Sequence, residues 1–132
     1  MEKITELFVV VENKPGALGD LLGHLARENV NIEAIGLFQD TAKLSVSEVD
    51  RAVSALRRGN YQVEVREVLR LDLDNKPGSF AFIASRLGAA RINIDYCYST
   101  IGKGQKTGAV ILDVTDLEGA MSALQGAESH SR

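Results

Sequence analysis

The chain has 132 residues, of which 45% are hydrophobic and 25% charged, as in an ordinary globular protein. Its net charge of −3, with basic and acidic residues interspersed, argues against a nucleic-acid surface, which needs a clustered basic face. It has a single cysteine, no signal-peptide pattern and no apolar run near the roughly 20 residues of a membrane span, so we expect a cytoplasmic protein without a membrane partner.

The first elements follow from side-chain periodicity. Residues 4–12 are β-branched and apolar, which predicts a buried strand. The turn Asn13-Lys14-Pro15-Gly16 ends it, and Pro15 suits a first helical turn because its φ is fixed and it has no N–H to lose. A helix follows, since leucines recur at the spacing of one helix face. Strands over residues 31–39 and 43–47, joined at residues 40–41, and a helix from Val49 come next.

The turn then recurs as Asn75-Lys76-Pro77-Gly78, 62 residues after its first occurrence. At the same offset, Val30-Asn31-Ile32-Glu33 is matched by Ile92-Asn93-Ile94-Asp95. The apolar positions of the first helix also recur. These matches indicate a duplicated domain of about 62 to 66 residues.

The second copy repeats the elements of the first. A helix, strands over residues 92–100 and 109–114, a longer hairpin at 102–106 and a helix from Leu117 are predicted. Between the copies, residues 61–74 form one β-run whose alternation slips at Glu67-Val68, where we expect the last strand of copy one to pass into the first strand of copy two.

Each copy therefore has the order βαββαβ, and we place domains at residues 1–66 and 67–132. Copy two is expected to lack its last strand, because only a short tail follows Leu124. We expect the strand edge left open at residues 68–73 to be covered, by dimerisation or by another segment.

This order, with Asn-Lys-Pro-Gly leaving strand one and (Val/Ile)-Asn-Ile opening strand two, resembles the ACT domain family in both copies. The resemblance implies an α+β fold of two ferredoxin-like βαββαβ repeats that share an antiparallel sheet with helices on one face. It also implies domains paired side by side, here in a homodimer, and a free amino acid bound between paired domains at the turn after strand one. No enzyme is attached in the small relatives of this length, so a partner enzyme or regulator would receive the signal.

The chemistry of the repeated residues agrees with such a ligand. The first-helix N-terminus offers unpaired N–H groups to a carboxylate, Gly lets the backbone approach closely, and an Asn side chain both donates and accepts. The candidate ligand residues are Asn13, Pro15, Gly16, Ala17, Asn31, Asn75, Pro77, Gly78, Ser79 and Asn93. In serine-binding relatives the turn Asn works with the strand-two Asn of a neighbouring domain, which would pair Asn13 with Asn93 and Asn75 with Asn31.

Some residues depart from that pattern or admit simpler roles. Serine-binding relatives carry a His two residues before the turn Asn, whereas this chain has Val11 and Leu73, so a more apolar amino acid is favoured. The asparagines could instead cap turns or satisfy backbone at strand starts. Cys97 is expected to be a small buried hydrophobe, and His24 a solvated helix residue.

Three functions compete. The first is a non-catalytic sensor that binds an amino acid. An enzyme is disfavoured, because the sequence shows no nucleophile–base set, paired carboxylates or metal-ligand spacing, and it implies no cofactor. The third is an assembly module that recruits another chain through its sheet edge.

Overall fold

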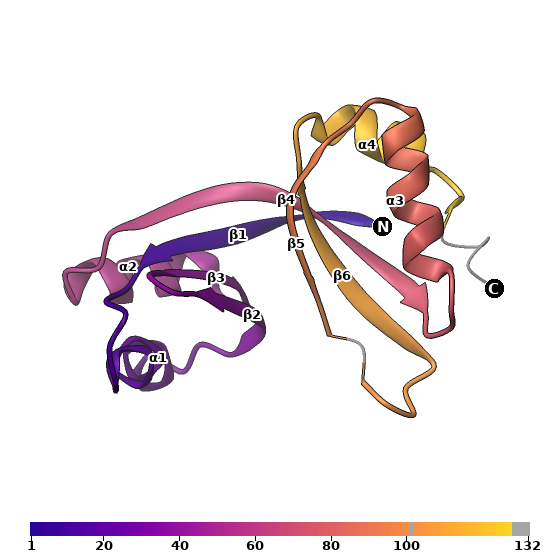
Figure 1. The fold of residues 1–132 in the computed structure, drawn as a ribbon. Coiled ribbons are helices and arrows are strands. Elements are labelled where there is room, and N and C mark those ends of the chain that lie inside the picture. The colour runs from indigo at the N-terminus through magenta and orange to yellow at the C-terminus, as the bar shows by residue number, and fades with distance from the viewer. Residues whose placement is uncertain (101, 128–132) are drawn as a thin grey trace. The chain divides into compact units, whose positions relative to one another are not determined.

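The computed structural model describes residues 1–100 and 102–127, and its contacts divide the chain into two units (Figure 1). The first unit is Thr5–Arg66, and the second combines Met1–Ile4 with the chain from Glu67 onward. Along the described chain the elements are β1 (Glu2–Val10), α1 (Ala17–Arg27), β2 (Ile32–Phe38), β3 (Thr41–Val46), α2 (Val49–Arg58), β4 (Val63–Asp74), α3 (Ser79–Ala89), β5 (Ile94–Ser99), β6 (Thr107–Val114) and α4 (Leu117–Ala123).

Within the first unit, β3 pairs antiparallel with both β1 and β2. Leu7 of β1 lies opposite Leu44 of β3, and both are fully buried. They pack with Leu21 of α1 and Leu56 of α2 in one apolar core. The alternation of β1 and the leucine stripe of α1 therefore bury their apolar sides against each other, as their periods predict.

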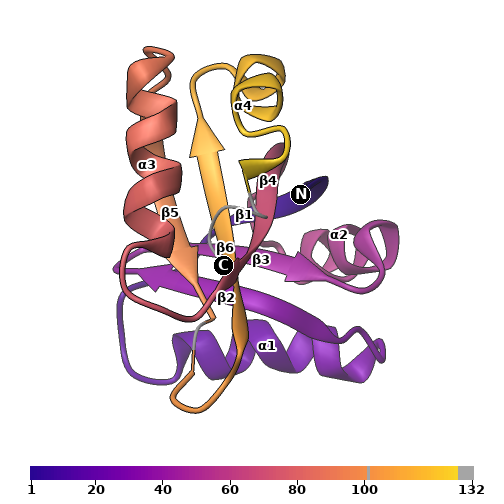
Figure 2. The same ribbon diagram turned by 90° about the vertical axis from the view of Figure 1, so that its right-hand side faces the viewer.

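The second unit repeats this plan, with β6 paired antiparallel with both β4 and β5. Leu69 and Leu71 of β4 pack with Ile83 of α3 and Leu112 of β6 in a separate core. In Figure 2, α3 and α4 both lie on the viewer's side of β5 and β6, so the helices of this unit cover one face of its strands.

Two strands take part in both units. Hydrogen bonding among the described strands runs in the order β2-β3-β1-β4-β6-β5. The boundary between the units falls after Ile4 in β1 and after Arg66 in β4, so each strand continues from one unit into the other. In β4 this boundary coincides with the predicted slip in alternation at Glu67-Val68.

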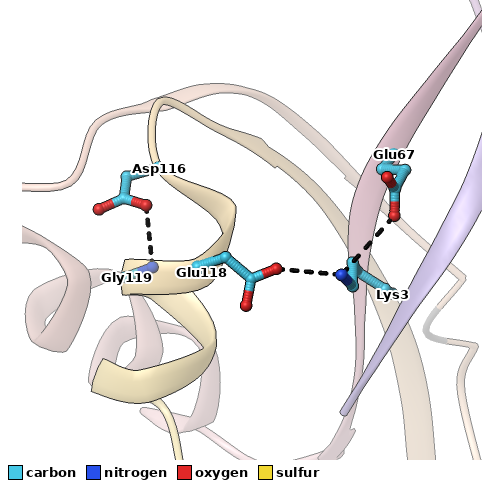
Figure 3. Close-up of polar contacts among 5 residues, drawn as sticks. All are labelled: Lys3, Glu67, Asp116, Glu118 and Gly119. Carbon is cyan, nitrogen blue, oxygen red and sulfur yellow. Dashed lines mark hydrogen bonds and ion pairs between the residues drawn. The ribbon is translucent and has the colours of Figure 1, made fainter.

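The start of β1 lies against β4 in the second unit. Lys3 Nζ lies 3.0 Å from Glu118 Oε1 of α4 and 3.8 Å from Glu67 Oε2 of β4 (Figure 3). These carboxylates raise the pKa of Lys3, chiefly through the Glu118 hydrogen bond. Glu2 also pairs with Arg70 of β4 at 3.6 Å. The sequence predicted that the strand edge at residues 68–73 is covered, and a segment of the same chain covers it.

Past α4, no strand occurs in the described residues, which end at 127; the rest of the expected tail lies outside them. The start of α4 is capped by Asp116, whose carboxylate accepts the Gly119 N–H at 2.9 Å (Figure 3). The prediction of an α+β fold built from two ferredoxin-like repeats is confirmed by the element order and the antiparallel pairings.

Candidate functional site

The two repeated motifs adopt the same backbone conformation. In the first, the Ala17 N–H donates to the Lys14 carbonyl at 3.2 Å, and Gly16 has φ 84° and ψ −15°. In the second, the Ser79 N–H donates to the Lys76 carbonyl at 3.3 Å, and Gly78 has φ 92° and ψ −16°. Pro followed by a left-handed Gly is the pattern of a type II turn, and each turn leads directly into a helix.

Neither helix start is capped by a side chain. After the Ala17 N–H, which closes the turn, the next N–H of α1 bonded to the turn is that of Asp20, which donates to Gly16 O at 3.0 Å. The N–H groups of Leu18 and Gly19 find no acceptor among the described residues. Two backbone donors at the positive end of the α1 dipole are thus available to an anion.

A hollow of about 120 Å³ adjoins the first turn. Its lining combines apolar and charged side chains: Val11, Glu12, Lys14, Ala17, Asp20 and Tyr61. Lys14 Nζ lies 3.0 Å from Glu12 Oε2, and this hydrogen bond and charge raise the pKa of Lys14. Burial, helped by the negative charge of Asp20, raises the pKa of Tyr61. The hollow therefore presents carboxylates, an ammonium and a neutral hydroxyl beside an uncapped helix start.

The two turn asparagines, Asn13 and Asn75, differ in their partners. The Asn13 side chain is exposed and makes no hydrogen bond within the described part of the chain. Asn75 Nδ2 donates to the carbonyls of Gly102 at 3.1 Å and Gln105 at 2.9 Å, in the loop between β5 and β6. The Asn75 backbone N–H also donates to Lys106 O at 2.8 Å. Of the two turn asparagines, Asn13 is the one whose side chain has no hydrogen-bond partner among the described residues.

The two strand asparagines share a backbone arrangement. Asn31 N–H donates to Ser47 Oγ at 3.0 Å, and Ser47 N–H returns a bond to Asn31 O at 3.0 Å. Asn93 and Thr115 repeat the exchange at 3.2 and 3.1 Å. The Asn93 side chain also donates to Asp95 Oδ1 at 2.9 Å. These exchanges hold the strand starts.

Within one unit, the turn Asn and the strand Asn lie far apart. Asn13 precedes α1 and Asn31 follows it, and the 11 residues of α1 make a helix about 16 Å long. The same holds for Asn75 and Asn93 around α3. A site that uses both kinds of Asn must therefore draw on more than one unit, and the pairs Asn13 with Asn93 and Asn75 with Asn31 remain predictions.

Sequence reasoning did not single out several of these residues. Tyr61 lies far from the first turn along the chain, and nothing in its own context points to the hollow. Ser47 and Thr115 could have been found, because they occupy matching positions at the 68-residue offset of the second helices. Pro15 and Pro77 lie in the turns as predicted, and Ala17 and Ser79 begin the helices.

Two predictions about single residues are wrong. Cys97 is exposed, because it lies on β5, which pairs only with β6 among the described strands and so lies at the edge of its unit. His24 is half-buried instead of solvated: its ring meets that of Tyr61 edge-on at 5.4 Å. Gly59 leaves room for this ring, since a Cβ there would come within 2.9 Å of it.

The described residues contain no group of three or more His, Cys, Asp or Glu side chains placed to hold a metal ion. None of the described helices has the length and apolar character needed to span a membrane.

Comparisons with known proteins agree with the fold. The sequence model of a family described as "ACT domain pair" matches residues 2–122. Among solved structures, protein BT0572 from Bacteroides thetaiotaomicron superposes with a TM-score of 0.85 at 26% identity, covering 95% of this chain and 88% of its own. No curated protein sequence matches this chain.

More distant structures share the fold. The regulatory subunit of aspartate kinase from Thermus flavus has a TM-score of 0.68 at 13% identity, covering 96% of this chain and 93% of that one. Aspartokinase III of E. coli, in complex with lysine and aspartate, has a TM-score of 0.61 at 18% identity, covering 98% of this chain and 31% of that one.

Proposed function

The chain belongs to the ACT domain pair family, and from this we propose that it is a non-catalytic regulatory protein that binds a free amino acid at ACT-domain interfaces. Two of its structural relatives are described as a regulatory subunit of aspartate kinase and as an aspartokinase bound to lysine and aspartate. In this chain, the domain pair would sense an amino acid and pass its occupancy to a partner enzyme or regulator.

The hollow at the first turn is the observation that carries this proposal. An amino acid presents a carboxylate and an ammonium close together. The carboxylate would accept hydrogen bonds from the free N–H groups of Leu18 and Gly19, and the Asn13 amide would donate or accept beside them. The ammonium would lie near the Glu12 and Asp20 carboxylates.

The size and lining of the hollow limit the ligand. A water molecule takes about 30 Å³, so 120 Å³ suits the charged end of an amino acid and leaves its side chain to extend toward a paired ACT domain. Val11, which is 4% exposed, supplies an apolar wall where serine-binding relatives carry a His. We therefore favour an amino acid with an apolar side chain over serine.

Domain pairing is supported by an open edge on the first unit. Of the strands of this unit, β2 pairs only with β3. It exposes three large apolar side chains: Ile35 at 38%, Leu37 at 42% and Phe38 at 46%. Exposed edges of this kind invite another strand. A homodimer formed along β2 would cover them and place a second domain beside the ligand.

Thermal unfolding in the presence of each of the twenty amino acids at millimolar concentration tests the proposal. A ligand that binds only the native state stabilises it by about 2.7 kcal/mol at a hundredfold excess over Kd. We expect one or a few amino acids to raise the midpoint and Asn13→Ala to abolish the shift. Without ligand, Asn13→Ala should unfold like the unchanged chain, because its side chain makes no hydrogen bond in the described structure.

The same exposed β2 edge favours a second candidate function. If none of the amino acids shifts the midpoint, the sensor proposal fails, and the chain would be an assembly module that recruits another protein without a small ligand. In that case, concentration-dependent mass in solution, lost when Leu37 is changed to Lys, would show that the β2 edge binds another chain without a small ligand.

A further inference from the structure

The second turn holds residues 102–106, which lie between β5 and β6, in place. The loop folds on itself, since Gln105 N–H donates to Gly102 O at 3.1 Å and Gly102 N–H donates to Gln105 Oε1 at 2.8 Å. Asn75 then joins the loop to the turn through three donated bonds, to Gly102, Gln105 and Lys106. An Asn side chain has two N–H donors, and both are used here.

The first turn makes no comparable side-chain contact to its neighbouring hairpin in the described structure. Its neighbouring hairpin turns at Gln39 and Asp40. Among the described residues, the hydrogen bond from this segment to the hairpin is a backbone one, in which Val11 N–H donates to Asp40 O at 2.9 Å. The Asn13 side chain is left without a partner in the described structure, and its chain neighbours Glu12 and Lys14 line the hollow. The copies share a backbone turn, but they use its Asn differently.

We infer that the two turns have divergent roles: Asn75 is a structural latch for the loop at residues 102–106, and each chain binds one amino acid, at the first turn. On this inference the predicted pair of Asn75 with Asn31 forms no ligand site, because both Asn75 side-chain donors are used by the loop. The part of this inference that concerns the ligand rests on the proposed function, whereas the part that concerns the latch does not. A ligand at the second turn that needed the Asn75 donors would have to break two hydrogen bonds to backbone carbonyls, whereas a ligand at the first turn breaks none at Asn13.

Two measurements on the full chain test the inference. Isothermal titration with the amino acid that gives the largest thermal shift should find one site per chain, and Asn75→Asp should leave that number and the affinity within about twofold. Asp keeps the size of Asn but cannot donate to the carbonyls of Gly102 and Gln105. Asn13→Asp is the matched variant, and we expect it to weaken binding at least tenfold.

Amide hydrogen exchange provides the second readout. Asn75→Asp should speed exchange at the amides of Gly102 and Gln105 by about tenfold, since hydrogen bonds that hold the loop are lost. Asn13→Asp should leave those amides unchanged.

Two bound ligands per chain, or an Asn75→Asp chain that loses binding while its loop stays protected, would overturn the inference. If no amino acid binds the unchanged chain, the proposed function and the single-site stoichiometry fail together, while faster loop exchange in Asn75→Asp would still support the latch.

Discussion

At the scale of single residues, the repeated motif defines a backbone shape more strongly than a role for each side chain. Pro15 and Gly16 form the same turn as Pro77 and Gly78, as expected for residues whose backbone preferences are local. The partner of an Asn side chain depends instead on which segment lies beside it. The 62-residue repeat could not show that only Asn75 meets a long loop.

The left-handed glycine at the first turn leads to a prediction about stability. A Cβ at Gly16 would meet nothing within 4 Å, but φ there is +84°, which an L side chain rarely adopts. We therefore expect Gly16→Ala to lower the free energy of unfolding by about 1–2 kcal/mol.

Gly19 provides the matched control. It lies three residues further on, inside α1, and a Cβ there would also meet nothing within 4 Å. Gly19→Ala should raise the free energy of unfolding by about 0.5–1 kcal/mol, because Ala is the better helix former. Urea unfolding of both variants measures the difference, and equal effects of the two substitutions would contradict the strain at Gly16.

The exposed Cys97 shows a limit of periodicity. Cys97 lies opposite Leu112, and its equivalent Ile35 lies opposite Leu44, so both lie on the sheet face that carries these buried leucines. Ile35 is nevertheless 38% exposed, as Cys97 is exposed, because each lies on a strand at the edge of its unit. Alternation tells which face a side chain takes, but it carries no information on how far the strand lies from the helices.

At the scale of elements, most of the fold could be predicted. The leucine spacing of α1 comes from burial on one side, which leaves a period in the sequence. The slip in the alternation of β4 falls where the strand passes from one unit into the other. The start of β1 was missed: the predicted strand begins at Ile4, whereas β1 begins at Glu2. Its first residues are exposed and charged, so no apolar period marks them.

These first residues should nevertheless matter for the second unit. Met1–Ile4 lies with the second unit, and β1 is the neighbour of β4 opposite β6. A chain that begins at Thr5 after an initiator Met would leave the second-unit part of β4 without its β1 neighbour on that side. We expect faster amide exchange in residues 67–71, a lower unfolding midpoint and a greater tendency to aggregate.

The variant Lys3→Ala distinguishes the contribution of the strand from that of its ion pairs. It removes the contacts to Glu67 and Glu118 but keeps the backbone of β1. Because exposed ion pairs contribute little, the midpoint and the exchange of residues 67–71 should change little. If Lys3→Ala were as damaging as the truncation, the ion pairs and not the strand would hold this edge.

At the scale of the whole molecule, two separate apolar cores are joined by strands that belong to both units. Leu21 lies in the first core and Ile83 in the second, and both are fully buried. Unfolding of the first unit would free β1, and the second unit would then lose the segment that lies against β4. The duplication therefore produced two repeats of which the second depends on a segment from the start of the first.

This dependence predicts a single cooperative unfolding transition. Leu21→Ala should cost about 2–5 kcal/mol through the cavity it leaves. Although this change lies in the first core, we expect it to weaken amide protection of β6 in the second unit, including Val110 and Leu112. Ile83→Ala is the matched variant, and it should weaken protection of β3 in return.

Two resolved transitions, or a Leu21→Ala chain in which β6 keeps its full protection, would show instead that the units unfold independently. Ligand binding at one turn would then have no route through the shared strands to the other unit, since coupling between sites requires an element whose equilibrium both of them influence.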